Sequence, residues 1–279
     1  MRPEVLVGGL HFGECPRWHA DRLWLSDVHG HRVLCVDLAG RIEVVAELPT
    51  QPAGLGWTRD GALLVVSMTD RRLLRLDGTA WAEVADLTAL ATWHCNDMVV
   101  DAAGRAYVGT FGFDLDGGAA AAPGQIILVG SGGRATLVAS DARFPNGMVL
   151  TPDGRTLVVA ESLGLALRAY DVADDGTLHG GRTWAELPGI VPDGICLDAA
   201  GHVWVASPLT KEVVRVREGG AVTARVGVSN HAFACMLGGS DRRTMFVLTA
   251  DDSVAATCRA RTSGRVEVFA VDVPGAGRP

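Results

Sequence analysis

Four oxygen-bearing side chains recur at regular intervals along the sequence, in surroundings that are otherwise apolar or small. Each lies eight residues before a turn signal, as in FPNGMVLTPDG, where Asn146 precedes Gly154. A carboxamide at the head of an apolar run needs a partner, because a buried polar group without one costs about 1–3 kcal/mol. The six positions that lie eight residues before a turn are Glu14, Ala53, Asn96, Asn146, Asp193 and Phe233.

Such a set of oxygens suits the binding of a cation. Two carboxylates and one or two carboxamide oxygens repel each other at one point unless a positive ion lies between them. Oxygen ligands without His or Cys favour Ca²⁺, with Mg²⁺, Mn²⁺ or Zn²⁺ as alternatives. We therefore expect Glu14, Asn146 and Asp193 to meet at one divalent ion. The alternative is that each Asx residue only forms a local turn at a strand start.

The turn signals themselves reveal an internal repeat. Successive turns are 39, 43, 50, 47 and 40 residues apart and cover almost the whole chain. Each repeat contains four short apolar runs separated by turns, which is typical of a propeller blade. The glycine of the turn is Gly61, Gly104, Gly154 or Gly201, and the degenerate copies HADRLWLSD and GSDRRTMFVL have Arg22 and Asp241 there.

The repeats predict an all-β fold, a six-bladed β-propeller with four-stranded antiparallel blades and a metal site in its central channel. One domain spans residues 1–279, and the C-terminal segment RVEVFAVDV closes the ring with the N-terminal segment. A solenoid of stacked sheets is the alternative, but it requires polar caps at its open ends.

Composition restricts the partners. The formal charge is −7 and the chain has a single lysine, Lys211, which argues against nucleic acid. No run of 18 apolar residues and no signal peptide is present, so we expect no membrane segment and a cytoplasmic location. The six cysteines are widely separated and are expected to be reduced. The sequence leaves monomer and homodimer open.

Several phrases resemble a known family. They are GECPRW with Glu14, CNDMVVDAAGRAYVGT with Asn96 and Asp97, FPNGM with Asn146, and PDGICLDAAGHVWVA with Asp193. The sequence resembles the senescence marker protein (regucalcin)/gluconolactonase family of six-bladed propeller hydrolases over essentially its whole length. The resemblance implies that Glu14, Asn146 and Asp193 bind a divalent metal and that Asn96 faces the metal or the substrate. It also implies lactone hydrolysis, with Asp193 as both ligand and general base.

The sequence departs from this family at one position. Relatives that act on sugar lactones often carry arginine two residues before the position of Asn96, where this chain has His94. A neutral, more apolar or aromatic lactone therefore agrees with the sequence as well as a sugar lactone does. We expect His94, Asn96 and Phe111 to contact the substrate. Asp97 either orients Asn96 or a metal-bound water, or is only a carboxylate at the strand edge.

The leading hypothesis is a divalent-metal-dependent lactonase that acts on a small molecule. The alternatives keep the pocket but change its use: a phosphotriesterase, a condensing enzyme or cyclase of the strictosidine synthase type, or a binding scaffold without catalysis. The sequence has no GxSxG, HExxH or Walker motif, which argues against serine hydrolases, zincins and P-loop enzymes. Residues 111–125 are expected to form a long loop, either a lid over the channel mouth or a plain connection.

Overall fold

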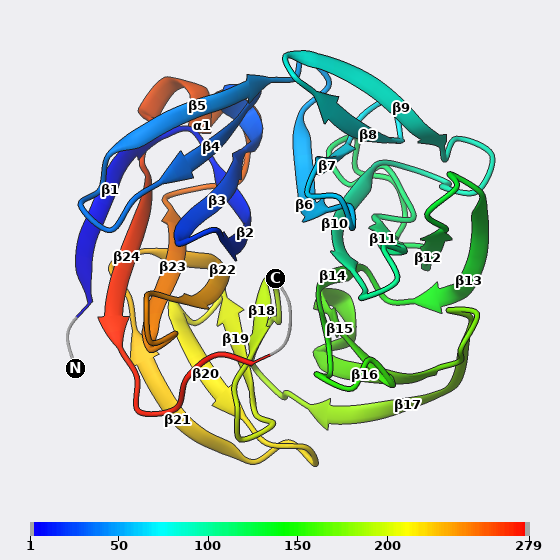
Figure 1. Cartoon of the computed structure of the whole chain (residues 1–279). Helices are drawn as coiled ribbons and strands as arrows, with labels where there is room; N and C mark the ends of the chain where they lie inside the picture. The colour runs from blue at the N-terminus through cyan, green and yellow to red at the C-terminus, as the bar shows by residue number, and fades with distance from the viewer. Residues whose placement is uncertain (1–2, 277–279) are drawn as a thin grey trace.

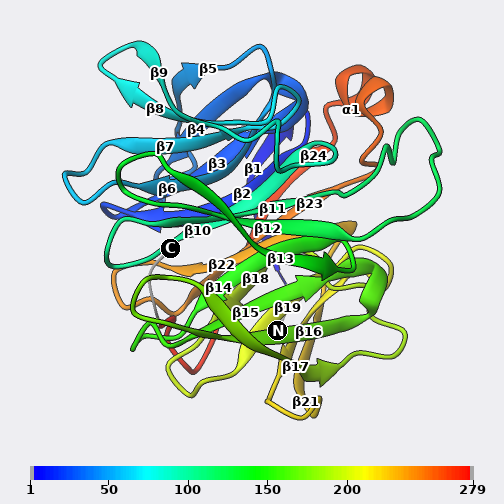
Figure 2. The same ribbon diagram turned by 90° about the vertical axis from the view of Figure 1, so that its right-hand side faces the viewer.

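A computed structural model describes residues 3–276, and these form six four-stranded antiparallel sheets around a central axis (Figure 1). The predicted six-bladed β-propeller is therefore confirmed. Residues 1–2 and 277–279 of the expected domain lie outside the described residues. Seen from the side, the sheets stack around the axis and the loops gather at its two ends (Figure 2).

In blades one to five the first strand lies closest to the axis and the fourth is outermost, so the sequence order of the strands is also their spatial order. Blades one to three contain β2 (Gly13–His19), β3 (Arg22–Asp27), β4 (Arg32–Val36), β5 (Ile42–Glu47), β6 (Pro52–Trp57), β7 (Leu63–Ser67), β8 (Arg72–Asp77), β9 (Ala80–Asp86), β10 (Cys95–Val100), β11 (Ala106–Thr110), β12 (Gly124–Val129) and β13 (Ala135–Ala142). Blades four and five contain β14 (Pro145–Leu150), β15 (Thr156–Glu161), β16 (Ala166–Val172), β17 (Leu178–Glu186), β18 (Ile195–Leu197), β19 (Val203–Ser207), β20 (Glu212–Val216) and β21 (Val222–Gly227).

The sixth blade joins the two ends of the chain. It contains β22 (His231–Gly238), β23 (Thr244–Ala250) and β24 (Gly264–Ala270), and β1 (Glu4–Leu10) is its outer strand. β1 pairs antiparallel with β24, with Glu4 opposite Val268 and Leu10 opposite Gly264. The predicted closure by RVEVFAVDV is thus confirmed, and an open solenoid is excluded.

The turns agree with the repeat except in its degenerate copies. Gly61, Gly104 and Gly154 have φ of 87°, 79° and 70°, a region that glycine reaches without strain. In the degenerate copies, Asp21 and Arg242 have left-handed φ of 57° and 58°. They lie next to Arg22 and Asp241, the residues that the repeat aligns with the glycines.

The glycines that follow the repeated positions allow neighbouring blades to touch. A Cβ on Gly54 would lie 2.4 Å from the Met98 nitrogen, and one on Gly147 would lie 2.6 Å from the Ile195 nitrogen. Backbone hydrogen bonds cross the same gap, for example from the Gly194 nitrogen to the Phe233 oxygen at 2.8 Å. These glycines therefore make room for the next inner strand.

Two longer connections lie at the end of the channel where the inner strands begin. One is 111–123, which leads from β11 to β12, so Gly124 and Gln125 of the expected loop belong to a strand instead. The other leads from β23 to β24 and contains a helix that the sequence did not predict, α1 (Ala255–Arg261). Short 3₁₀ turns, η1 (Val28–Gly30) and η2 (Ser162–Gly164), follow β3 and β15.

Two expectations from composition can be compared with the described residues. None of the helices within residues 3–276 has the length and apolar character needed to cross a membrane. All six cysteines are free and buried. The Cys196 and Cys235 sulfurs, on neighbouring inner strands, are 3.8 Å apart.

Closure of the ring can be tested on β1. Leu10 is fully buried in the core, whereas Val5 on the same strand is 54% exposed. We expect Leu10→Ala to lower the free energy of unfolding by about 2–5 kcal/mol, because it leaves a cavity in the core. Val5→Ala should change it by about 0.5 kcal/mol or less. Urea unfolding followed by tryptophan fluorescence measures both, and equal effects would contradict the packing of β1 into the ring.

Candidate functional site

A cavity of about 210 Å³ opens at the end of the central channel where the inner strands start. All six positions identified from the repeat line it, although they come from six different blades. His94 and Phe111 also line it, whereas Asp97 does not. The positions counted from the repeat are therefore structurally equivalent in the six blades. They are Glu14, Ala53, Asn96, Asn146, Asp193 and Phe233.

Irregular strand pairing directs these side chains into the cavity. The ladder between the first and second strand of a blade is interrupted between Glu14 and Arg17, between Cys95 and Met98, and again after Pro145. Bulges of this kind turn a side chain out of the plane of the sheet and are common next to active sites. In blade five, Asp193 precedes the first paired residue, Ile195.

The carboxamide of Asn146 has its partners within the protein. Ser162 donates its hydroxyl proton to the Pro192 oxygen at 2.7 Å, so its oxygen can only accept from the Asn146 Nδ2, 3.2 Å away. The Asn146 Oδ1 therefore lies on the other side, where the Asn96 Nδ2 is 3.3 Å away. This network satisfies the amide group, whose side chain lines the cavity and also hydrogen-bonds to Asp193.

Two carboxyl groups lie in the cavity with strongly perturbed pKa values. The pKa of Glu14 is raised to about 8, mainly by burial. The charge of Asp97 raises this pKa further, whereas a hydrogen bond from the Cys15 nitrogen lowers it. Burial also raises the pKa of Asp193 well above its usual value, and the charges of Glu14 and Asp97 add to the shift. Each carboxylate therefore makes ionisation of the other less favourable.

Arg17 supplies the positive charge that acts on this group, and it is already paired. Its guanidinium contacts the Asp97 Oδ1 at 2.6 Å, and both side chains are buried. It also donates to the Pro16 and Met98 carbonyl oxygens. This guanidinium is paired with Asp97, and its charge also lowers the pKa of Glu14. Full ionisation of Glu14, Asp97 and Asp193 would therefore leave two negative charges without compensation.

The donors in this cavity fit a hard divalent cation. Glu14, Asp193 and Asn146 line the cavity, and their carboxylate and amide groups offer oxygen atoms, the ligands that such ions prefer. An ion of charge +2 would balance the two uncompensated charges. Within residues 3–276, no group of three or more His, Cys, Asp or Glu side chains is arranged to hold a metal. A site here would therefore need the Asn146 amide as a third ligand.

Aromatic rings form two walls of the cavity. Phe12 and Phe233, from blades one and six, have ring centroids 4.8 Å apart. Phe111 and Phe144, from blades three and four, are also separated by 4.8 Å. His94 lies 6.1 Å from the Phe111 ring, and burial lowers the pKa of its imidazole. A neutral His94 at this wall can donate or accept a hydrogen bond.

Several residues of the cavity were not identified from the sequence. They lie in connections between strands, where the repeat gives no register. The His29 Nε2 faces the Ser253 oxygen at 2.9 Å, and its Nδ1 accepts from the Gln51 Nε2 at 3.2 Å. This imidazole thereby connects blade one to the segment before α1. The other missed residues of the lining include Phe12, Met68, Leu115, Asp116 and Phe144.

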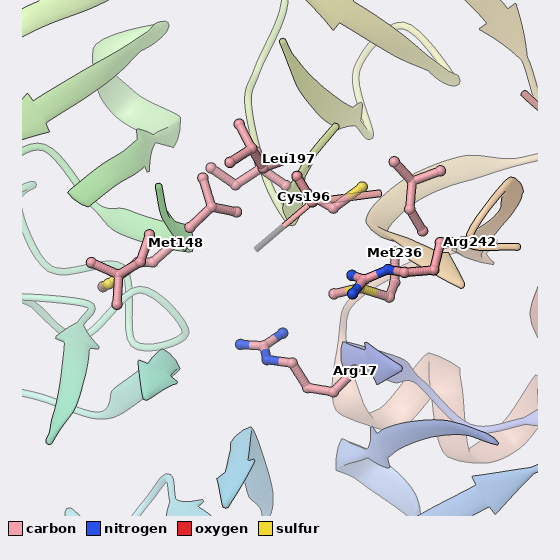
Figure 3. Close-up of a pocket in the computed structure, with 11 residues that line it drawn as sticks. Arg17, Met148, Cys196, Leu197, Met236 and Arg242 are labelled. Carbon is pink, nitrogen blue, oxygen red and sulfur yellow. The ribbon is translucent and has the colours of Figure 1, made fainter. Parts of the chain in front are cut away.

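Arg17 separates this cavity from a narrower space further along the same inner strands. Figure 3 shows its side chain pointing into the channel, with Met148, Cys196 and Met236 around it. Ala276, near the C-terminus, also lines this narrower space, and the Ala276 nitrogen donates to the Leu197 oxygen at 2.9 Å. Arg17 and the mostly apolar side chains therefore form the floor beneath the carboxylates.

Known proteins share this fold and much of this sequence. A pentonolactonase of Haloferax volcanii is 27% identical over 99% of this chain and 95% of its own length. A 6-deoxy-6-sulfogluconolactonase of Pseudomonas putida is 27% identical over 96% and 94%. The crystal structure of a calcium-binding regucalcin from Agrobacterium tumefaciens has a TM-score of 0.83 at 23% identity, covering 100% and 96% of the two chains.

The pattern of one family matches residues 12–251, which contain five complete blades, two of the four strands of the sixth and all six positions around the cavity. The chain belongs to the SMP-30/gluconolactonase/LRE-like family.

Proposed function

We propose that this protein is a lactonase that depends on a divalent cation, with Ca²⁺ as the preferred ion. The observation that carries the proposal is the pair of buried carboxyl groups, Glu14 and Asp193, that line one cavity, where burial and neighbouring negative charge raise the pKa of both. The pentonolactonase and sulfogluconolactonase relatives support lactone hydrolysis. In this proposal Glu14, Asn146 and Asp193 hold the ion.

A bound divalent ion supplies Lewis acidity toward a carbonyl oxygen and an oxyanion. The residues of the chain perform the remaining tasks. Asp193 accepts a proton from the water that attacks the lactone carbonyl carbon, and it returns this proton to the ring oxygen as the C–O bond breaks. The water thus becomes the hydroxyl of the new acid, and the ring oxygen becomes an alcohol. Asn96 holds the Asn146 amide in place by donating to its Oδ1.

The other polar residues have supporting tasks. His94 lies beside Phe111 at the wall and donates a hydrogen bond to an oxygen of the substrate. Asp97 does not contact the substrate in this proposal, because it is paired with Arg17 below the cavity. Its task is to hold the guanidinium, which limits the negative charge beneath Glu14.

The role of Asp193 can be tested by Asp193→Asn. We expect kcat on δ-valerolactone to fall by about 10²–10⁴-fold, because the amide cannot accept the proton from water. Asp174→Asn, in an exposed turn of blade four, is the control and should keep wild-type activity. Hydrolysis is followed by the acid released. A loss of less than tenfold would remove Asp193 from the mechanism, and a wild-type protein that hydrolyses no lactone would contradict the proposed function.

The cation can be tested through stability, without an activity assay. The folded-state pKa of Glu14 lies above the usual value, so its contribution to stability is present below about pH 4.5 and is lost as the pH rises through about 8. Chelator-treated wild type should therefore melt at lower temperature at pH 9 than at pH 5. Glu14→Gln should weaken this dependence and melt a few degrees higher than wild type at pH 9.

Addition of Ca²⁺ should reverse the order of the two proteins. An ion at 100 times its Kd stabilises the wild type by about 2.7 kcal/mol, and Glu14→Gln should lose most of this gain. Glu186→Gln, on the exposed edge of blade four, is the control and should behave as wild type. An equal shift of the melting temperature by Ca²⁺ in all three proteins would show that Glu14 is not a ligand.

Ser162 is expected to position a ligand, since it holds the nitrogen of the Asn146 amide. Ser162→Ala removes one of the hydrogen bonds that hold the amide and leaves the one from Asn96, and we expect the Kd for Ca²⁺ to rise about 10–100-fold. Ser131→Ala, in an exposed turn, is the control. Calcium titration calorimetry on the chelated proteins measures both affinities. An unchanged affinity in Ser162→Ala would contradict the role of Asn146 as a ligand.

A further inference from the structure

The cavity offers no basic side chain to an acidic substrate. Among the described residues that line it, none is lysine or arginine. Arg17 lies below, and its donors contact Asp97 and two backbone carbonyls. Asp116 also lines the cavity. Burial lowers the pKa of His29 and of His94, and the charge of Asp116 offsets part of this effect. A phosphate, sulfonate or carboxylate on the substrate would therefore find no lysine or arginine to pair with, and the charge of Asp116 would repel it.

The cavity also has few hydrogen-bond donors available for hydroxyl groups. Both nitrogens of His29 have partners, the Ser253 oxygen and Gln51. The Asn96 Nδ2 already faces the Pro145 oxygen at 3.4 Å and the Asn146 Oδ1. A substrate that carries several hydroxyls would bury some of them without partners, at a cost of about 1–3 kcal/mol each. The polar lining thus suits the reacting ester group better than a polyol.

The two aromatic walls face each other across the cavity. In a ring of six blades, the boundary between blades six and one lies opposite the boundary between blades three and four (Figure 1). Phe12 and Phe233 belong to the first boundary, and Phe111 and Phe144 to the second. Met68 adds a flexible apolar side chain between them. An alkyl or aromatic group of the substrate would be buried between these rings.

From these three observations we propose that the substrate is a neutral lactone with an apolar substituent, not a sugar lactone or an anionic one. This inference rests on the proposed lactonase function. A cavity of about 210 Å³ is smaller than most drug-sized pockets, so the substituent is short and the lactone has a single ring. Phe111, Phe144 and Phe233 determine the specificity, because they supply the apolar surface.

Four lactones with the same six-membered ring test the inference on the Ca²⁺-loaded protein: δ-valerolactone, δ-nonalactone, D-glucono-δ-lactone and its 6-phosphate. Each kcat/KM is divided by the rate constant of uncatalysed hydrolysis. We expect δ-nonalactone to exceed δ-valerolactone by about 10–100-fold, because burial of each methylene favours binding. Gluconolactone should fall at least about tenfold below δ-valerolactone, and its phosphate lower still.

Variants connect the preference to the aromatic wall. Phe111→Ser should reduce the ratio of δ-nonalactone to δ-valerolactone about tenfold, since it removes half of one wall. Leu209→Ser is the control, an apolar side chain that is 65% exposed and outside the cavity, and it should keep the wild-type ratio. Asp116→Asn should raise kcat/KM for the 6-phosphate several-fold, because it removes a like charge at the rim.

A binding measurement supplies a readout that does not depend on turnover. The lactam counterpart of δ-nonalactone is not hydrolysed, and calorimetry should detect it binding about tenfold more tightly to wild type than to Phe111→Ser. A preference for gluconolactone or its phosphate, with hydrolysis that still needs the cation, would overturn this inference and leave the lactonase proposal intact. Failure to hydrolyse all four lactones, with no binding of the lactam, would overturn both.

Discussion

The close approach of neighbouring inner strands is the constraint on which the rest of this structure depends. Gly54, Gly147 and Gly194 leave no room for a side chain between one blade and the next, and backbone hydrogen bonds cross the same gap. A wider ring would separate the six repeated positions, because each belongs to a different blade. The glycines therefore determine the size of the cavity as well as the packing of the core.

That narrow ring brings like charges together. Glu14 and Asp193 lie in one small cavity above Asp97, whose charge raises the pKa of both. Arg17 offsets one charge through its pair with Asp97, and it does so from below, where it also forms the floor of the cavity. Such an arrangement costs stability in the absence of a cation, and residues that only stabilise the fold would not need it. The cost is the physical reason to assign the carboxylates a function.

The wall of the cavity has a different character from its floor. Around the carboxylates the side chains are mostly aromatic or aliphatic, and the polar ones among them largely hydrogen-bond to each other. The family match includes the phrases around Glu14, Asn146 and Asp193, so family membership carries information about the carboxylates and the amide. The wall comes from connections that differ in length from blade to blade, and there the chemistry of this chain must be judged on its own residues.

The number of blades could be predicted from the sequence alone, as could their strand content and the six positions of the ring. The reason is that a repeated turn fixes a register that can be counted. It also predicted closure of the ring by residues near 265–273, since a propeller without closure exposes an edge. It did not indicate the backbone conformation of the two turns without a repeat glycine, where Asp21 and Arg242 are left-handed. It missed α1, which is a single short helix in an otherwise β chain.

The contacts between side chains of different blades became visible only in the folded protein. Asn146 has two hydrogen-bond partners. Ser162 follows another strand of the same blade and Asn96 belongs to another blade, so no local sequence pattern connects them with Asn146. The pairing of Asp97 with Arg17 spans 80 residues and removes Asp97 from the cavity, where the sequence had left two roles open. His29, Asp116 and the aromatic walls lie in irregular connections, whose positions follow from packing between blades. Contacts of this kind depend on distances in space, which a repeat along the chain does not specify.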